Sequence, residues 1–164
     1  MSINHLLADL PDHTRIWLYL AGQPFNKTQE SFVEEQLAQF THAWQAHGAA
    51  LSAGFAIWQQ QLLVLGVDET QQPATGCSID ASYRIIKHIE QHLGVSLSNR
   101  LLIPIWEKEK LKVYTPQDAT GLISAETHVL DLTLTTLGSF RQKGISPITD
   151  TWMKRYLTQA HVSS

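Results

Sequence analysis

The order in which two apolar periodicities follow one another constrains the fold of this chain more than any other feature of its sequence. Four short runs of aliphatic and aromatic residues are typical of strands, and they occupy positions 15–20, 51–57, 62–67 and 100–106. Between them, apolar residues recur every three or four positions over 28–46 and 79–93, which is typical of amphipathic helices. Gly48 and Gly94 follow these patterns and are good helix-stop residues. The sequence therefore predicts the order strand, helix, strand, strand, helix, strand.

This order matches the ferredoxin-like βαββαβ motif, an antiparallel sheet in spatial order 4-1-3-2 that carries both helices on one face. The fourth strand of that motif lies at a sheet edge. Pro104, inside the run at 100–106, lacks the N–H group that an interior strand donates, so it favours an edge strand or a bulge. We therefore predict an α+β, ferredoxin-like fold rather than a parallel doubly wound sheet.

The last third of the chain has a less regular pattern. Residues 107–110 are typical of a hairpin turn, 111–114 and 128–135 of strands, and 149–158 of a final helix capped by Thr149 or Asp150. No repeat, low-complexity tract or linker composition separates this part from the rest. The 164 residues are thus predicted to form a single domain, with a core at about 14–106 and a carboxy-terminal extension at about 107–164.

The charge balance argues against nucleic acid or an anionic membrane surface as the partner. The chain has 12 Lys plus Arg residues against 15 Asp plus Glu residues, a net charge of -3, and no run of like charge. We expect a small molecule or another protein as the partner, and we predict no cofactor. No apolar stretch of about 18 residues and no basic leader are present, and the single cysteine cannot form an internal disulfide. A soluble, cytoplasmic protein is the expectation.

The predicted strand directions bring three distant segments to one edge of the sheet. Residues 46–48 connect the first helix to the second strand, residues 68–77 connect the third strand to the second helix, and residues 106–107 end the fourth strand. We expect a thiol, an imidazole and several carboxylates to cluster on this rim, because binding sites commonly form on loops that a rigid scaffold holds.

Cys77, the only cysteine, is predicted to lie in the first turn of the second helix. Unpaired N–H groups and the helix dipole stabilise a thiolate at that position. One interpretation makes Cys77 a nucleophile or redox thiol and His47 its base, with an orienting carboxylate drawn from Asp68, Glu69 or Asp80. The alternative makes Cys77 a small apolar residue at a helix start, Asp80 a first-turn carboxylate and Asp68 a turn residue.

The same helix start is also a candidate anion site that needs no covalent chemistry. The backbone donors of Gly76, Cys77 and Ser78 could receive a phosphate or carboxylate, with help from a basic side chain. The basic candidates are Lys27, Arg84 and Arg100, and Glu69 and Asp80 flank this ligand-binding set. The alternative is a helix start whose donors are satisfied by Thr75, Ser78 and water.

Two further motifs match known phosphate-binding and metal-binding patterns only in part. The segment 22–28 ends in Lys27-Thr28 like a phosphate-binding P-loop, but its spacing is one residue short and Asn26 stands where the second glycine belongs. A proline turn leading to a helix cap at Asn26 or Thr28 explains the segment better. His88 and His92 have the spacing of a helical metal pair, but no third ligand accompanies them.

Several short motifs along the chain resemble those of one protein family. The motifs are Arg15-Ile-Trp-Leu-Tyr19, Ala46-His47-Gly48 after Phe40 and Trp44, Val67-Asp68-Glu69, Gly76-Cys77-Ser78-Ile79-Asp80 and Asp150-Thr151-Trp152. They resemble a family of short, uncharacterised bacterial proteins that often carry the label "ABC transporter ATPase", over about residues 14–152. The resemblance implies a family but no reaction, and a chain without a P-loop is not expected to hydrolyse ATP.

Three functions are compatible with these observations. The first is a non-enzymatic domain that binds a small ligand or a protein through the rim of His47, Asp68, Glu69 and Cys77. The second is a cysteine-dependent enzyme in which His47 assists Cys77. The third is a structural module that forms a homodimer through an exposed sheet face or the carboxy-terminal segment. The fold alone favours none of them, because ferredoxin-like folds serve many unrelated functions.

Overall fold

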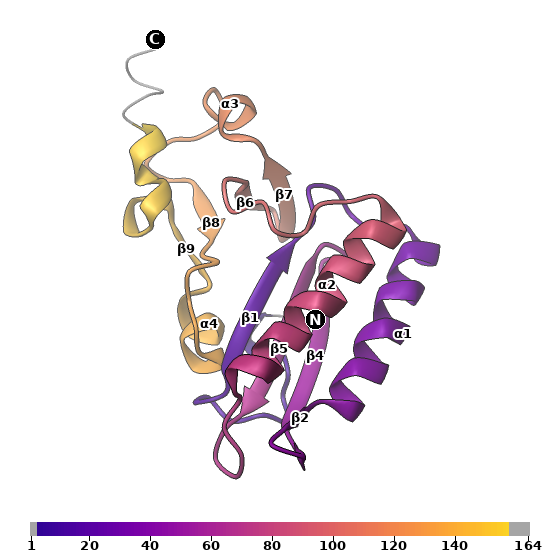
Figure 1. The fold of residues 1–164 in the computed structure, drawn as a ribbon. Helices are drawn as coiled ribbons and strands as arrows, with labels where there is room; N and C mark the ends of the chain where they lie inside the picture. Colours follow the sequence, from indigo (N-terminus) through magenta and orange to yellow (C-terminus); the bar gives the residue numbers. More distant parts are fainter. Residues whose placement is uncertain (1–2, 158–164) are drawn as a thin grey trace.

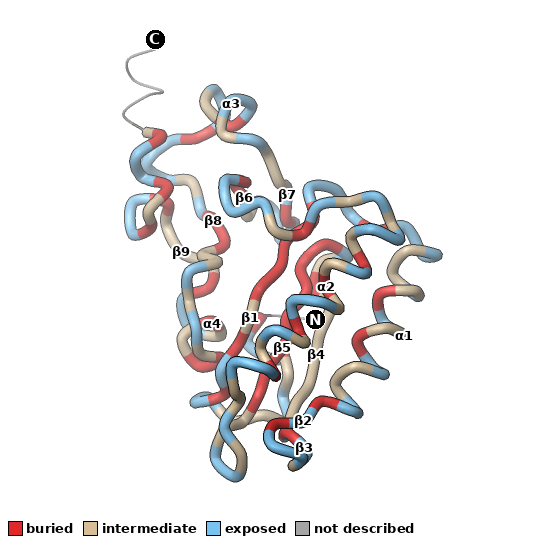
Figure 2. The backbone as a smooth tube through the Cα atoms, viewed as in Figure 1, coloured by how far each residue is buried: buried red, intermediate tan, exposed pale blue. Residues whose placement is uncertain are grey.

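A computed structural model describes residues 3–157 of the chain (Figure 1). Its first sheet contains three antiparallel strands in the order β1-β5-β4, formed by β1 (Arg15–Leu20), β5 (Leu62–Asp68) and β4 (Ser52–Trp58). These strands confirm the predictions at 15–20, 51–57 and 62–67. The central strand β5 has six of its seven residues buried, as expected when both faces of a strand are covered (Figure 2).

Two helices, α1 (Lys27–Ala43) and α2 (Gly76–Leu93), cover one face of this sheet (Figure 1). Their buried aliphatic side chains pack with Leu63 and Leu65 of β5 in one hydrophobic cluster, and they are Val33, Leu37, Ile86 and Ile89. Gly94 ends α2 in the left-handed conformation at φ 66°, as the sequence predicts. Both predicted helices are therefore confirmed.

Helix α1 ends at Ala43 rather than at residue 46, because the next residues form a tight hairpin. Trp44 is already extended, and β2 (Gln45–Ala46) pairs with β3 (Ala49–Ala50). His47 and Gly48 form the turn, and both have positive φ angles of 53° and 77°. Two-residue hairpin turns need positive φ at these positions, which glycine adopts most easily. The His-Gly pair is thus a turn rather than a helix stop.

The other face of the first sheet is covered by both ends of the chain. The amino-terminal lead contains the short 3-10 helix η1 (Ile3–His5) and contributes Ile3 and Leu6. The carboxy-terminal part contributes Leu137 and Phe140 from helix α4 (Leu137–Lys143). These side chains pack with the sheet residues Ile16, Leu18, Leu20, Leu62 and Val64 in a second hydrophobic cluster. The first sheet is therefore the middle layer of the molecule.

The predicted fourth strand does not join the first sheet. It forms β6 (Ile103–Glu107), which pairs with β7 (Lys110–Tyr114) and β8 (His128–Leu130) in a second antiparallel sheet. The order of that sheet is β7-β6-β8-β9, with β9 (Ile145–Pro147) at its edge. The structure is therefore an α+β protein with antiparallel sheets, and the ferredoxin-like topology is not found in residues 3–157.

The outer edge of β1 explains why the fourth strand pairs elsewhere. The N–H group of Leu20 donates to the carbonyl of Leu97, and the N–H group of Ile16 donates to the carbonyl of Thr135. Two loop segments thus occupy both ends of the position where a fourth strand would lie. Pro104 is not in an edge strand, but the pairing of β6 with β8 covers only Ile105 and Trp106 and stops before the proline.

The remaining carboxy-terminal predictions are confirmed in part. The hairpin turn at 107–110 is present, with Lys108 and Glu109 at positive φ, and it joins β6 to β7. The strand predicted at 128–135 ends at Leu130, and short helices occur at α3 (Pro116–Ala119), η2 (Ile148–Asp150) and η3 (Trp152–Lys154). Thr151, not Thr149 or Asp150, accepts the capping hydrogen bond of η3, from Met153. Position 158 of the predicted helix lies outside the described residues.

Within residues 3–157, no helix combines the length and the hydropathy that crossing a membrane requires.

Candidate functional site

Two of the three segments predicted to share a rim do so, and the third lies at the opposite end of the sheet. Ser52 and Asp68 are paired residues at one end of the β4–β5 hairpin, next to the β2–β3 turn and the start of α2 (Figure 1). Trp106 instead stacks on Trp58, with ring centroids 5.1 Å apart, at the other end of β4. The prediction for Trp106 and Glu107 is wrong because β6 belongs to the second sheet.

His47 and Cys77 line the same small pocket at the shared end. Both residues are exposed, and the pocket has a volume of about 240 Å³. Its other lining includes Phe40, Trp44 and Ser78, and the Nε1 atom of Trp44 donates a 2.8 Å hydrogen bond to the carbonyl of Ser78. That bond fixes the start of α2 against the end of α1. No hydrogen bond joins His47 to Cys77 in the described part of the chain.

The three candidate carboxylates either bond to other groups or are exposed to solvent. Asp68 accepts hydrogen bonds from the backbone and hydroxyl groups of Thr70, and His13 lies 2.9 Å from the same carboxylate. These contacts hold the pKa of Asp68 below its usual value, and the hydrogen bond from the Thr70 hydroxyl group has the largest effect. Glu69 accepts from the N–H group of Ala74, and Asp80 is exposed on α2. Among residues 3–157, none of these carboxylates therefore forms a hydrogen bond that would orient His47.

The start of α2 is capped by two of its own side chains. Thr75 caps the helix through its hydroxyl oxygen, which accepts from the Ser78 N–H group, and the Ser78 hydroxyl oxygen accepts from the Thr75 N–H group. Two of the three basic candidates lie elsewhere: Lys27 begins α1 at the opposite end of the sheet, and Arg100 donates to the carbonyl of Leu18. The third, Arg84, is exposed on α2 itself. Thr75 and Ser78 therefore cap this turn, while Gly76 and Cys77, whose N–H groups also belong to the predicted anion site, lie exposed within it.

The two weaker motifs also have structural roles. The side chain of Asn26 caps α1 and accepts from the N–H group of Gln29, which confirms the segment 22–28 as a turn and helix cap. His92 stacks on Phe32 of the neighbouring helix, with ring centroids 3.9 Å apart. The described residues contain no cluster of three or more side chains suited to a metal ion.

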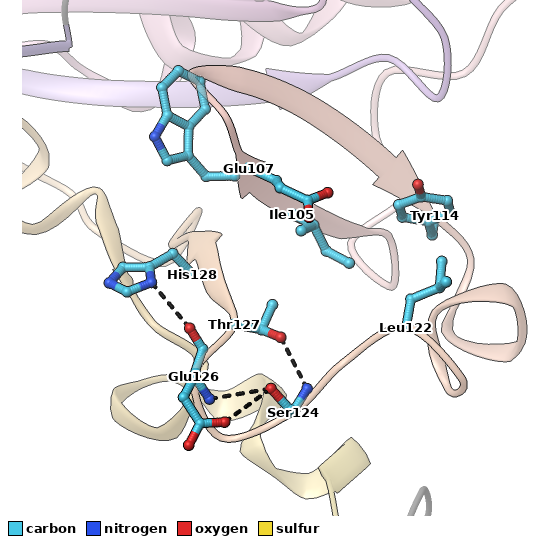
Figure 3. Close-up of a pocket in the computed structure, with 9 residues that line it drawn as sticks. Ile105, Glu107, Tyr114, Leu122, Ser124, Glu126, Thr127 and His128 are labelled. Carbon is cyan, nitrogen blue, oxygen red and sulfur yellow. Dashed lines mark hydrogen bonds between the residues drawn. The ribbon is translucent and has the colours of Figure 1, made fainter.

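A pocket of about 370 Å³ in the second sheet contains a serine, a glutamate and a histidine (Figure 3). The Ser124 hydroxyl donates to the carboxylate of Glu126 at 3.1 Å, while Nδ1 of His128 lies 3.2 Å from the Glu126 backbone carbonyl. A nucleophilic serine needs the imidazole as its direct partner. Ser124 and Glu126 instead stabilise the turn between them, so this pocket lacks the contacts of acyl-transfer catalysis.

A large, mainly apolar groove lies beside the outer edge of β1. It has a volume of about 580 Å³ and lies between β1, the segment 132–135 and the residues around η3. Its walls are mainly aliphatic and aromatic, from Ile16, Trp17, Leu18, Leu101, Leu132, Leu134 and Trp152. Leu101, on one wall, is 61% exposed. We refer to this opening as the β1 groove.

Two arginines, Arg100 and Arg155, are the charged residues that line the β1 groove, and both are exposed. No Asp or Glu belongs to its lining among the described residues. The Nη1 atom of Arg100 donates a 2.8 Å hydrogen bond to the carbonyl of Leu18, which fixes its guanidinium against the middle of β1. The groove therefore combines apolar walls with an uncompensated positive charge.

The middle of β1 also offers a backbone donor to the β1 groove. Successive N–H groups of a strand alternate between its two sides, and those of Ile16 and Leu20 both point away from β5. The N–H group of Leu18 therefore faces the same side, and none of the described residues accepts a hydrogen bond from it. It lies on the strand that the Arg100 guanidinium contacts.

Sequence reasoning missed the β1 groove, although its residues carried a signal. Leu132 and Leu134 alternate with polar residues, which predicts that they belong to the strand at 128–135. They follow the end of β8 instead, and their side chains face the gap that a fourth strand would have filled. Only the actual pairing of β6 shows that this gap exists.

A scan against protein-family models, a search of curated proteins and a search of solved structures each find no match for this chain.

Proposed function

We propose that this protein is a binding module and that its ligand is a small molecule with an apolar body and a carboxylate, held in the β1 groove. The observation that carries this proposal is the composition of the groove: mainly apolar walls, two arginines and no acidic side chain in its described lining. Small-molecule sites are typically apolar concavities of roughly 300–1,000 Å³ with a few convergent polar groups. The β1 groove, at about 580 Å³, has this size and this composition.

The contacts of the groove suggest how the ligand is oriented. A carboxylate beside Arg100 can accept charge-assisted hydrogen bonds from the guanidinium donors that do not contact Leu18. The unpaired N–H group of Leu18 adds a backbone donor on the same strand. The apolar body then covers Leu101 and Trp152, whose burial supplies the hydrophobic part of the affinity. Arg155 lies in the wall as a second cation.

Tryptophan fluorescence provides the test, because Trp17 and Trp152 both line the groove. The experiment titrates the protein with decanoate and, separately, with decanol, which has the same chain length but no charge. Decanoate should change the emission and saturate, with an affinity about tenfold or more above that of decanol, as expected for one charge-assisted contact.

A matched pair of variants locates the site. Arg155→Gln removes a cation that lines the groove and should weaken decanoate binding several-fold, whereas Lys154→Gln removes a neighbouring exposed cation outside it and should leave binding unchanged. Equal affinity for decanoate and decanol, or equal losses in the two variants, would contradict a carboxylate site in this groove.

The cysteine-dependent enzyme is the second candidate, favoured by one observation. Cys77 is exposed and lines a pocket together with His47. If His47 activates the thiol, the rate of alkylation of Cys77 depends on His47 as well as on pH, so a rate that is unchanged in His47→Ala removes this candidate. ATP hydrolysis is not proposed, because the only P-loop-like segment serves as a helix cap at Asn26.

A further inference from the structure

Strand β4 forms one edge of the first sheet, and β1 forms the other. The backbone hydrogen bonds between the three strands determine which N–H and C=O groups of β4 point away from the sheet. Ile16 and Leu20 point away from β5, so the alternate residues of β1, Trp17 and Tyr19, bond to β5 at Leu65 and Leu63. Leu62, Val64 and Gly66 of β5 then bond to Trp58, Ala56 and Gly54 of β4. The backbone groups of Ala53, Phe55 and Ile57 therefore point away from the sheet.

These three residues form an unpaired backbone edge. In the described part of the chain, no backbone group outside the sheet bonds to Ala53, Phe55 or Ile57. All three residues are half-buried. The edge thus presents three N–H groups and three C=O groups in an alternating row.

Proteins usually protect such an edge with a charge, a proline, a bulge or a very short strand. β4 has none of these features. Its seven residues, Ser-Ala-Gly-Phe-Ala-Ile-Trp, contain no charged side chain and no proline, and its pairing with β5 is regular from end to end. The edge is therefore suited to pairing with another strand.

We propose that β4 pairs with β4 of a second copy of this chain, antiparallel, around a two-fold axis that passes beside Phe55. In this register Phe55 faces Phe55 of the second copy, and Ala53 faces Ile57. Each outward N–H group then donates to a carbonyl across the axis, as in hydrogen-bonded antiparallel pairs. The two three-stranded sheets become one continuous six-stranded sheet.

Charge and geometry both permit β4 to pair with β4 of a second copy. An isologous antiparallel pairing brings each strand against itself, and like charges directly opposite one another would destabilise it. β4 carries no charge, so this repulsion does not arise. In the antiparallel pairing, the N–H and C=O groups of Ala53, Phe55 and Ile57 lie opposite the C=O and N–H groups of Ile57, Phe55 and Ala53 of the second copy. This dimer leaves the β1 groove open, because β1 and β4 are opposite edges of the sheet.

Sedimentation of the full chain gives the first test. Over about 1 to 100 µM, the mass should rise toward twice the 18.4 kDa of the monomer. Ala53→Pro removes one outward N–H group per copy without removing a bond to β5, and it should raise the dissociation constant about 30-fold. Ala53→Ser, which keeps the N–H group, should dissociate like the wild type. A monomer at every concentration would overturn the proposal.

Cross-linking tests the register independently, even if Ala53→Pro fails to fold. In a Cys77→Ser background, Phe55→Cys places two thiols across the axis, where facing Cα atoms are about 5.5 Å apart and within disulfide range. Mild oxidation should therefore link the dimer covalently. Ser52→Cys in the same background is the control, because its two copies would be about 20 Å apart. A dimer that links through Ser52→Cys, or not through Phe55→Cys, has a different interface.

Discussion

Arg141 holds the amino-terminal lead in place through an unusual number of contacts for one side chain. Its guanidinium donates to the backbone carbonyls of Leu6, Leu7 and Leu10 at 2.6 to 3.1 Å, and to the carboxylate of Asp12 at 2.9 Å. The arginine side chain is only 15% exposed, so its guanidinium is largely shielded from water. One residue of α4 thus attaches the lead to the back of the first sheet.

Replacing Arg141 by Met should lower the free energy of unfolding by about 2 to 4 kcal/mol, because several partly buried carbonyls lose a charged donor. Urea unfolding followed by circular dichroism measures this change. Lys143→Met is the control, since Lys143 is exposed on the same helix and should alter stability by less than about 0.5 kcal/mol. Similar unfolding midpoints for both variants would mean that the Arg141 contacts contribute little.

The start of α2 is a self-contained element in which the sequence specifies its own local structure. Thr75 and Ser78 exchange hydrogen bonds between side chain and backbone, which satisfies the N–H groups of both residues. The same turn carries Cys77 and is attached to α1 through the bond from Trp44 to Ser78. Its geometry therefore controls the pocket that His47 and Cys77 share.

Thr75→Ala should destabilise the protein by about 1 kcal/mol, the usual cost of losing a helix cap. Thr75→Ser keeps the hydroxyl group and should restore most of this loss. Thermal unfolding of the three proteins provides the comparison, and a Thr75→Ala midpoint equal to that of the wild type would show that water replaces the cap.

At the scale of the whole molecule, one hydrophobic cluster joins the two sheets. It contains Leu18 and Trp58 of the first sheet, Leu111 and Leu130 of the second, and Phe140 of α4. Trp58 also stacks on Trp106 of β6. Part of the predicted carboxy-terminal extension, including Leu111, Leu130 and Phe140, therefore contributes to the core of the first sheet.

The full chain should consequently unfold in a single transition, with the same urea midpoint by tryptophan fluorescence and by circular dichroism. A chain that ends at residue 106 loses Leu111, Leu130, Leu137 and Phe140 from this cluster and should show no cooperative transition. A cooperative transition in the shortened chain would show that the first sheet folds without the second.

The elements that depend on neighbouring residues alone are predictable from the amino-acid sequence. The strands at 15–20 and 62–67 follow from apolar runs, the helix at 79–93 from its periodicity, and its end from Gly94. The caps at Asn26 and Thr75 belong to the same class, because each depends on residues within three positions. These features need no knowledge of distant parts of the chain.

Strand pairing and the position of the openings depend instead on contacts between distant parts of the chain. The run at 100–106 has the same local preference in either sheet, and its pairing with β7 and β8 depends on loops that bond to Leu20 and Ile16 of β1. The His-Gly turn, the β1 groove and the unpaired edge of β4 follow from that choice or from backbone angles. Strand pairing is a competition between distant segments for backbone hydrogen bonds, and apolar periodicity does not encode its outcome.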